Sequence, residues 1–182
     1  FRSLAWCATW HACSLIPSLR IQYAMDIVIR EATTEDAPLL AHLTRTCWAG
    51  KVAETSSGHH ESSEKVAEEL SLGGGFILLV DEDPAGSVRW LPVDGETNTW
   101  EMRRMGILPA FRGEALSQHL LEAVIHHAQT SGVEELRLGV RTDQPRLVDL
   151  YTAYEFELAP ELEYAHANPK EPMPHVMRRI LR

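Results

Sequence analysis

The sequence of 182 residues is poor in cysteine and has no long apolar run. Its three cysteines, Cys7, Cys13 and Cys47, fit neither a paired metal-binding motif nor an even disulfide framework, so we expect reduced thiols and a cytoplasmic protein. A membrane-spanning helix needs about 20 consecutive apolar residues, and because no such run is present we expect no membrane partner. The adjacent pair His59-His60 lacks the spacing of a zinc-binding helix, and we expect no metal site.

Basic residues are also scarce. The chain has 17 Lys and Arg against 26 Asp and Glu, a formal net charge of -9, so it lacks the basic excess of a nucleic-acid-binding domain. We therefore expect no nucleic-acid partner.

The first 24 residues differ in composition from the remainder. Residues 1–24 hold two arginines, no acid and two of the three cysteines, and Met25 then precedes an alternating apolar segment. We expect residues 1–24 to be an N-terminal extension, non-native or disordered, and residues 25–182 to be the folded domain. A native but poorly ordered arm is the alternative for the extension.

Apolar periodicity from Met25 onward predicts a mixed α/β domain, since alternation indicates strands and recurrence every three or four residues indicates helices. The order of elements predicts a mixed, mostly antiparallel sheet flanked by helices, with a hairpin turn at 82–86. The expected strands are 27–31, 76–80, 87–91, 99–107, 136–140, 156–158 and 176–181. The expected helices run from the caps at 33–36 to residue 47, from 62 or 63 to 70, over 115–131, and from Pro145.

Residues 99–117 carry the most informative motif. A strand leads to Pro109, and a turn with Gly113 leads into a long helix, so several backbone N–H groups and the positive end of the helix dipole face one loop. Such a loop binds anions, most naturally a phosphate or a pyrophosphate. An ordinary strand-to-helix turn is the alternative. The loop has neither the GKS/T of a P-loop nor the G-x-G-x-x-G of a dinucleotide site.

The segment Arg112-Gly113-Glu114-Ala115-Leu116-Ser117 resembles the R/Q-x-x-G-x-G/A signature of the GNAT superfamily of N-acetyltransferases. The resemblance covers nearly all of residues 25–182, including the opening IREATTEDAPLLAHL, the run FILLV and the segment DLYTAYEF at 149–156. It implies the GNAT fold, acetyltransferase activity and acetyl-CoA as cosubstrate. Ala115 and Ser117 depart from the glycines of the signature, from which we expect weaker or slightly shifted CoA binding.

The resemblance also implies which residues hold the cofactor. The backbone of Met105 and Ile107 should pair with the pantetheine arm, and Gln144 stands where the family often has an asparagine near the cofactor. The Arg112 side chain can add positive charge. The amides expected to hold the diphosphate are those of Arg112, Gly113, Glu114, Ala115, Leu116 and Ser117.

Two residues are expected to transfer the protons. Glu101 lies four residues before Met105, the offset at which the family often has its general base, and strand alternation should put Glu101, Arg103 and Met105 on one face. A solvated glutamate paired with a neighbouring arginine is the alternative, and Glu54 could serve as base instead. Tyr151 matches the family tyrosine that protonates the CoA sulfur, with a core tyrosine on an apolar helix face as its alternative.

The sequence thus predicts an acetyl-CoA-dependent N-acetyltransferase that acetylates a primary amine of a small molecule, with Glu101 as base and Tyr151 as acid. A protein or peptide N-acetyltransferase and a non-catalytic acyl-CoA-binding module are the alternatives. The acidity of the chain weakly favours a cationic amine. We expect residues 50–70 and 164–175 to shape the acceptor site, and a homodimer is possible.

Overall fold

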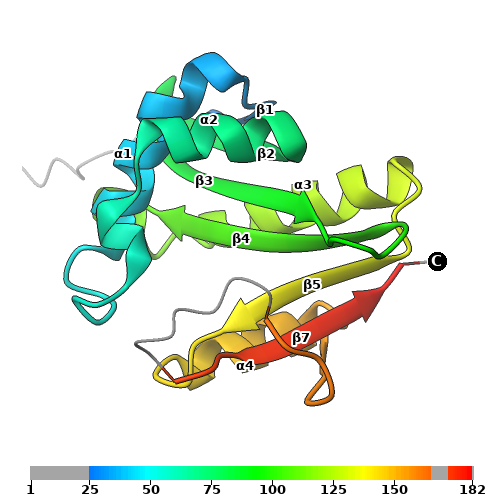
Figure 1. Cartoon of the computed structure of the whole chain (residues 1–182). Coiled ribbons are helices and arrows are strands. Elements are labelled where there is room, and N and C mark those ends of the chain that lie inside the picture. Colours follow the sequence, from blue (N-terminus) through cyan, green and yellow to red (C-terminus); the bar gives the residue numbers. More distant parts are fainter. Residues whose placement is uncertain (1–24, 165–171, 182) are drawn as a thin grey trace, which may run out of the picture.

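The computed structural model describes residues 25–164 and 172–181. The expected extension 1–24, with Cys7 and Cys13, lies outside the described residues, as do residues 165–171. The described strands form one sheet in the order β1-β2-β3-β4-β5-β7-β6 (Figure 1). They are β1 (Ile27–Glu31), β2 (Gly74–Val80), β3 (Asp83–Pro92), β4 (Thr99–Ile107), β5 (Glu135–Val140), β6 (Glu157–Leu158) and β7 (His175–Ile180).

All neighbouring strands in the sheet are antiparallel except β4 and β5, which are parallel. The expected mixed, mostly antiparallel sheet is therefore confirmed. Helices α1 and α2 lie on one face, and α3 and α4 lie on the other (Figure 1). The helices are α1 (Ala37–Trp48), α2 (Ser63–Leu72), α3 (Leu116–Thr130) and α4 (Pro145–Ala153), with short 3-10 turns η1 (Thr34–Asp36), η2 (Ser57–His60) and η3 (Pro109–Phe111).

Local side-chain chemistry sets several element boundaries. The Asp36 carboxylate accepts a hydrogen bond from the Thr33 backbone N–H at 2.9 Å and so fixes the start of η1 and α1. The Ser62 hydroxyl accepts one from the first turn of α2. The β2–β3 turn is the pair Asp81-Glu82, both with positive φ, and it lies earlier than the expected turn at 82–86.

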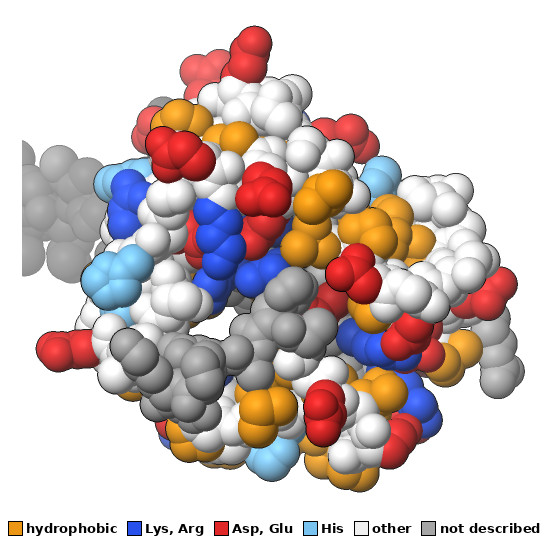
Figure 2. Space-filling view, viewed as in Figure 1, with side chains coloured by type: hydrophobic (Ala, Val, Ile, Leu, Met, Phe, Trp, Pro, Cys, Tyr) orange, Lys and Arg blue, Asp and Glu red, His pale blue; other side chains and the backbone are white. Residues whose placement is uncertain are grey.

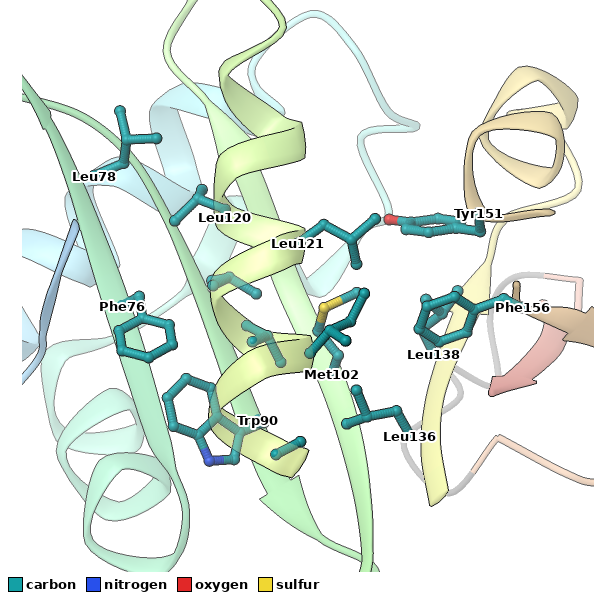
Figure 3. Close-up of a cluster of buried hydrophobic side chains, with 14 of the residues drawn as sticks. Phe76, Leu78, Trp90, Met102, Leu120, Leu121, Leu136, Leu138, Tyr151 and Phe156 are labelled. Carbon is teal, nitrogen blue, oxygen red and sulfur yellow. The ribbon is translucent and has the colours of Figure 1, made fainter. Parts of the chain in front are cut away.

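Two apolar cores fill the two sides of the sheet. Alternation along β2 sends Phe76 and Leu78 into the core under α3 and α4, and Ile77 into the core under α1 and α2. Figure 3 shows the larger core, in which Leu120 and Leu121 of α3 pack over the sheet. Within the described part of the chain, none of the helices combines the length and apolar character needed to cross a membrane.

β4 contains a β-bulge at Arg104. Between Arg103 and Gly106, β4 has one residue more than the β3 segment that pairs with it. Arg104, inside this interval, has φ 56°, in the left-handed region. A bulge of this kind shifts the side-chain alternation of the strand beyond it.

The bulge separates Met105 from the residues that precede it. Met105 packs against the core on the α3 side, whereas Arg103 reaches Glu69 of α2 on the opposite face. The expectation that Glu101, Arg103 and Met105 share one face is therefore wrong for Met105. Strict alternation fails because the extra residue resets it.

β4 and β5 diverge at the same level. Their parallel pairing runs from Thr99↔Glu135 to Met102↔Leu138 and ends there, although β4 continues to Ile107. The edge of β4 from residue 103 onward, on the β5 side, therefore lies outside this ladder and faces the opening between the two strands.

Candidate active site

A cleft of about 700 Å³ opens where β4 and β5 diverge. Its walls come from the end of α1 and the segment after it, the bulged half of β4, the loop before α3, the end of β5 and α4. Figure 2 shows the hollow, with Lys and Arg side chains on its wall. The expected site residues that line it are Met105, Ile107, Arg112, Gly113, Ala115, Leu116, Ser117, Gln144 and Tyr151.

The loop before α3 presents backbone amides to the cleft. Gly113 has φ 98°, and a Cβ at this position would meet no atom within 4 Å. Among the described residues no side chain caps the N-terminus of α3, so the amides of Leu116 and Ser117 lie at an uncapped helix start. The helix dipole and these free N–H groups together favour an anion at this end of the cleft. Glu114 belongs to the loop but is exposed and does not line the cleft in the described structure.

Ala115 is the N-cap residue of α3 and has φ 55° and ψ 17°. The helix was expected to include residue 115, with helical dihedral angles there; it starts one residue later, and Ala115 is left-handed instead. This conformation costs an L-residue roughly 1 kcal/mol that glycine does not incur. Glycine, which the family signature has at this position, would adopt the conformation without this cost.

Arg112 ties the loop to its neighbours. Its Nε donates to the carbonyl of Ile107 at 3.2 Å, and its Nη2 donates to the carbonyl of Cys47 at 2.9 Å. These bonds join the end of β4, the end of α1 and the loop. On another wall, the Gln144 amide donates to the carbonyl of Lys51 at 3.5 Å and links the start of α4 with the segment after α1.

Tyr151 is buried in α4 and also lines the cleft. Its ring packs edge-on against Phe156, with the ring centroids 5.9 Å apart, and its hydroxyl points toward α3 on the side of Leu121 (Figure 3). Burial raises the pKa of the Tyr151 phenol above its ordinary value, and nearby Tyr164 raises it further. The phenol is therefore protonated at neutral pH, as a proton donor must be.

Glu101 is buried and is not among the described residues that line the cleft. It is only 4% exposed, so the alternative of a solvated strand glutamate is wrong. Its carboxylate helps to raise the pKa of Tyr164 to about 12, after the larger effect of burial. The Tyr164 ring lines the cleft and covers Gly139, where a Cβ would lie 2.9 Å from the ring. Tyr164 thus lines the cleft and is close enough to Glu101 for the carboxylate to raise its pKa, whereas Glu54 is exposed and is not among the described lining residues.

A buried network of arginines and glutamates, which the sequence analysis missed, supports one wall. Arg89 of β3 lies 3.2 Å from Glu61 and 2.9 Å from Glu69. Arg104 lies 2.7 Å from Glu61, and Arg103 lies 3.4 Å from Glu69. Charged residues at inward positions of β3 and β4 were a visible signal. Their partners could not be identified, because Glu61 and Glu69 are distant in sequence and reach the strands only through the packing of α2.

The profile of the Acetyltransferase (GNAT) family matches residues 38–156. Two curated relatives are each named mycothiol acetyltransferase. The protein from Kytococcus sedentarius is 29% identical over 133 residues, which cover 67% of this chain and 45% of that protein. The protein from Propionibacterium freudenreichii subsp. shermanii is 32% identical over 104 residues, which cover 54% of this chain and 33% of that protein. The chain therefore spans less than half the length of these relatives.

Among solved structures, PaiA N-acetyltransferase from Thermoplasma acidophilum in complex with coenzyme A has the same fold. The TM-score is 0.69 at 19% identity, over 86% of this chain and 99% of that one. The chain belongs to the acetyltransferase (GNAT) family. The GNAT fold implied by the sequence resemblance is confirmed.

Proposed function

We propose that this chain transfers the acetyl group of acetyl-CoA to a primary amine of a small molecule, by direct attack of the amine on the thioester. One cleft brings together the uncapped start of α3, the open edge of β4 and the buried phenol of Tyr151, and this juxtaposition supports the proposal. The name shared by the two curated relatives favours a small-molecule acceptor over a protein.

The residues of the loop fit a diphosphate. The amides of residues 112–117 would hold it, with the open space above Gly113 admitting the phosphates closely. The backbone of Met105 and Ile107 would pair with the pantetheine arm along the edge of β4 that β5 leaves open. Gln144 would close the cleft around the cofactor from the α4 side.

The chain supplies both proton transfers. The amine nitrogen forms the amide bond as the thioester C–S bond breaks, and the Tyr151 hydroxyl gives its proton to the departing sulfur. Glu101 takes the proton that the amine loses. Because Glu101 is not among the described residues that line the cleft, the proton would reach it through an intervening group, and we propose Tyr164 for this role, since it lines the cleft and is close enough to the Glu101 carboxylate for that charge to raise its pKa.

The test measures acetyl-CoA binding by calorimetry and the release of CoA thiol with small amines and with peptides that carry a free N-terminus. We expect binding, and turnover of small amines in preference to peptides. Preferential turnover of peptides would favour the protein acetyltransferase alternative. Absence of acetyl-CoA binding would contradict the proposal outright.

Tyr151→Phe tests the acid directly. We expect kcat to fall by about 10²-fold or more, because the thiolate loses its proton donor, while acetyl-CoA affinity is retained since the ring still packs on Phe156. Tyr154→Phe is the matched control, since its hydroxyl donates to Glu122 at 3.0 Å and Tyr154 does not line the cleft in the described structure. Equal kcat values for the two variants would remove Tyr151 from the mechanism.

A further inference from the structure

The charged side chains that line the cleft differ in sign from the net charge of the chain. The net charge of the chain is -9, yet the described residues that line the cleft include five basic side chains and no acidic one. The basic residues are Lys51, Arg103, Arg104, Arg112 and Arg141. Basic side chains at the surface of a cleft, with no acidic one beside them, favour anionic molecules there.

Three of these side chains belong to the cofactor end. Arg112 is part of the loop proposed to hold the diphosphate. The carbonyl of Lys51 contacts the Gln144 amide. Arg141 directly follows β5, precedes Gln144 by three residues and pairs with Asp143 at 3.0 Å. The phosphates of the cosubstrate account for positive charge at this end.

Arg103 and Arg104 lie at the other end. They precede Met105, where the pairing proposed for the pantetheine arm begins, so they lie beyond its thioester end, on the side from which an acceptor approaches. Arg104 also donates from Nη2 to the hydroxyl of Ser57 at 2.8 Å. Because Ser57 lines the cleft as well, the Arg104 guanidinium is held at the wall of the acceptor side. The phosphates of the cosubstrate do not explain this second pair of charges.

The carboxylates that pair with these arginines lie behind them. The Glu61 side chain is 0% exposed and that of Glu69 is 7% exposed, and neither lines the cleft in the described structure. A molecule in the cleft therefore meets guanidinium groups before it meets carboxylates. A second positive charge placed there would be repelled at short range in a poorly screened environment.

The two guanidiniums also have donor capacity left. Each carries five N–H donors, and Arg103 Nε is buried with no hydrogen-bond partner among the described residues. The fork of an arginine matches the paired oxygens of a carboxylate or a phosphate.

We propose that the acetyl acceptor carries an anionic group, a carboxylate or a phosphate, close to its primary amine, and that Arg104 and Arg103 bind this group. The inference deepens the proposed function and rests on it. The inference predicts that polyamines are poor acceptors, whereas the net charge of the chain weakly favoured cationic amines. A positive wall also favours the neutral, nucleophilic form of the amine.

The test compares acceptors that share an amine and differ at the other end. Glycine, β-alanine and γ-aminobutyrate are each paired with their amides, phosphoethanolamine is paired with ethanolamine, and putrescine supplies the cationic case. We expect kcat/KM to be about tenfold or more higher for at least one anionic acceptor than for its neutral partner, the effect of one charge-assisted hydrogen bond. The carboxylate and phosphate arms then show which anion is preferred.

The variant Arg104→Gln should abolish this preference, with a loss of about tenfold or more for the anionic acceptor and little change for its amide. Arg103→Gln is a second variant. In each case Arg89 still pairs with both Glu61 and Glu69, so no carboxylate is left without a cation.

Arg178→Gln is the matched control, since Arg178 pairs with Glu157 and Glu161 and does not line the cleft in the described structure. Acetyl-CoA affinity, measured by calorimetry on every protein, should not change. Failure of the wild-type protein to bind acetyl-CoA would contradict the proposed function. Two results would overturn the inference. One is a protein that binds acetyl-CoA but prefers amides or putrescine as acceptors. The other is that both arginine variants keep the preference for the anionic acceptor.

Discussion

Arg89 is fully buried between two carboxylates. Burial lowers its pKa, and the charges of Glu69 and Glu61 oppose that shift. A buried ion network of this kind adds little net stability over well-packed apolar side chains, because desolvation offsets the attraction. Its value here is positional, since it fixes Arg103 and Arg104 at the wall of the cleft.

The Asp36 carboxylate, unlike the buried ion network, stabilises the fold. Hydrogen bonds from Arg30 at 2.7 and 2.8 Å are the main reason that its pKa is lowered to about 2. Since the folded pKa lies below the ordinary value of 3.8, the stabilisation is fully present above pH 4 and is lost as the pH falls through 2.

We therefore expect Asp36→Asn to lower the free energy of unfolding by about 1 kcal/mol at neutral pH, less than the pKa shift alone would give, because solvent screens the exposed Arg30 partner. The variant should also lose less stability than the wild type between pH 4 and pH 2. Urea unfolding at a series of pH values measures both effects. Asp83→Asn, at an exposed aspartate of β3, is the control. Parallel pH profiles for wild type and Asp36→Asn would contradict the assignment.

At the level of elements, periodicity predicted the type of each described strand and helix, and the bounds of β1 and β4 agree with the expected ones. Local pattern could not predict the bulge at Arg104, because it depends on how β4 pairs with β3. Glu101 was correctly predicted as a strand residue. Its orientation relative to Met105 was predicted wrongly, because the bulge lies between the two residues. The cleft residues near α3 were predictable because they form one contiguous motif, whereas Arg103, Arg104 and their partners come together only in the folded sheet.

The left-handed conformation of Ala115, where the loop joins α3, lowers the stability of the protein. Ala115→Gly should raise the free energy of unfolding by about 1 kcal/mol, since glycine adopts the left-handed conformation of this residue without strain. Removing the methyl group from the cleft should also tighten acetyl-CoA binding. Thermal unfolding and calorimetry measure the two effects.

Ala123→Gly, in the interior of α3, is the matched control with the opposite expected sign. It should lower stability by about 1 kcal/mol, because glycine is unfavourable within a helix. If both variants destabilised the protein equally, the argument from strain at Ala115 would be incorrect.

At the scale of the whole molecule, every site residue proposed here lies in residues 25–182. We propose that these residues form the acetyltransferase domain. A chain starting at Met25 should therefore retain the unfolding midpoint, acetyl-CoA affinity and turnover of the 182-residue chain. Circular dichroism, calorimetry and thiol release measure these properties. A lower midpoint or lost activity would show that residues 1–24 are a native arm that the domain needs.

The divergence of β4 and β5 affects the stability of the folded protein. The sheet consists of an antiparallel part, β1 to β4, and a second part, β5 to β7, joined by the short ladder that ends at Met102↔Leu138. On the proposed binding mode, the pantetheine arm fills the gap beyond that ladder and hydrogen-bonds to the edge of β4 while it is bound. The donor would then be a structural component as well as a reactant, and the folded population would increase with the supply of acetyl-CoA.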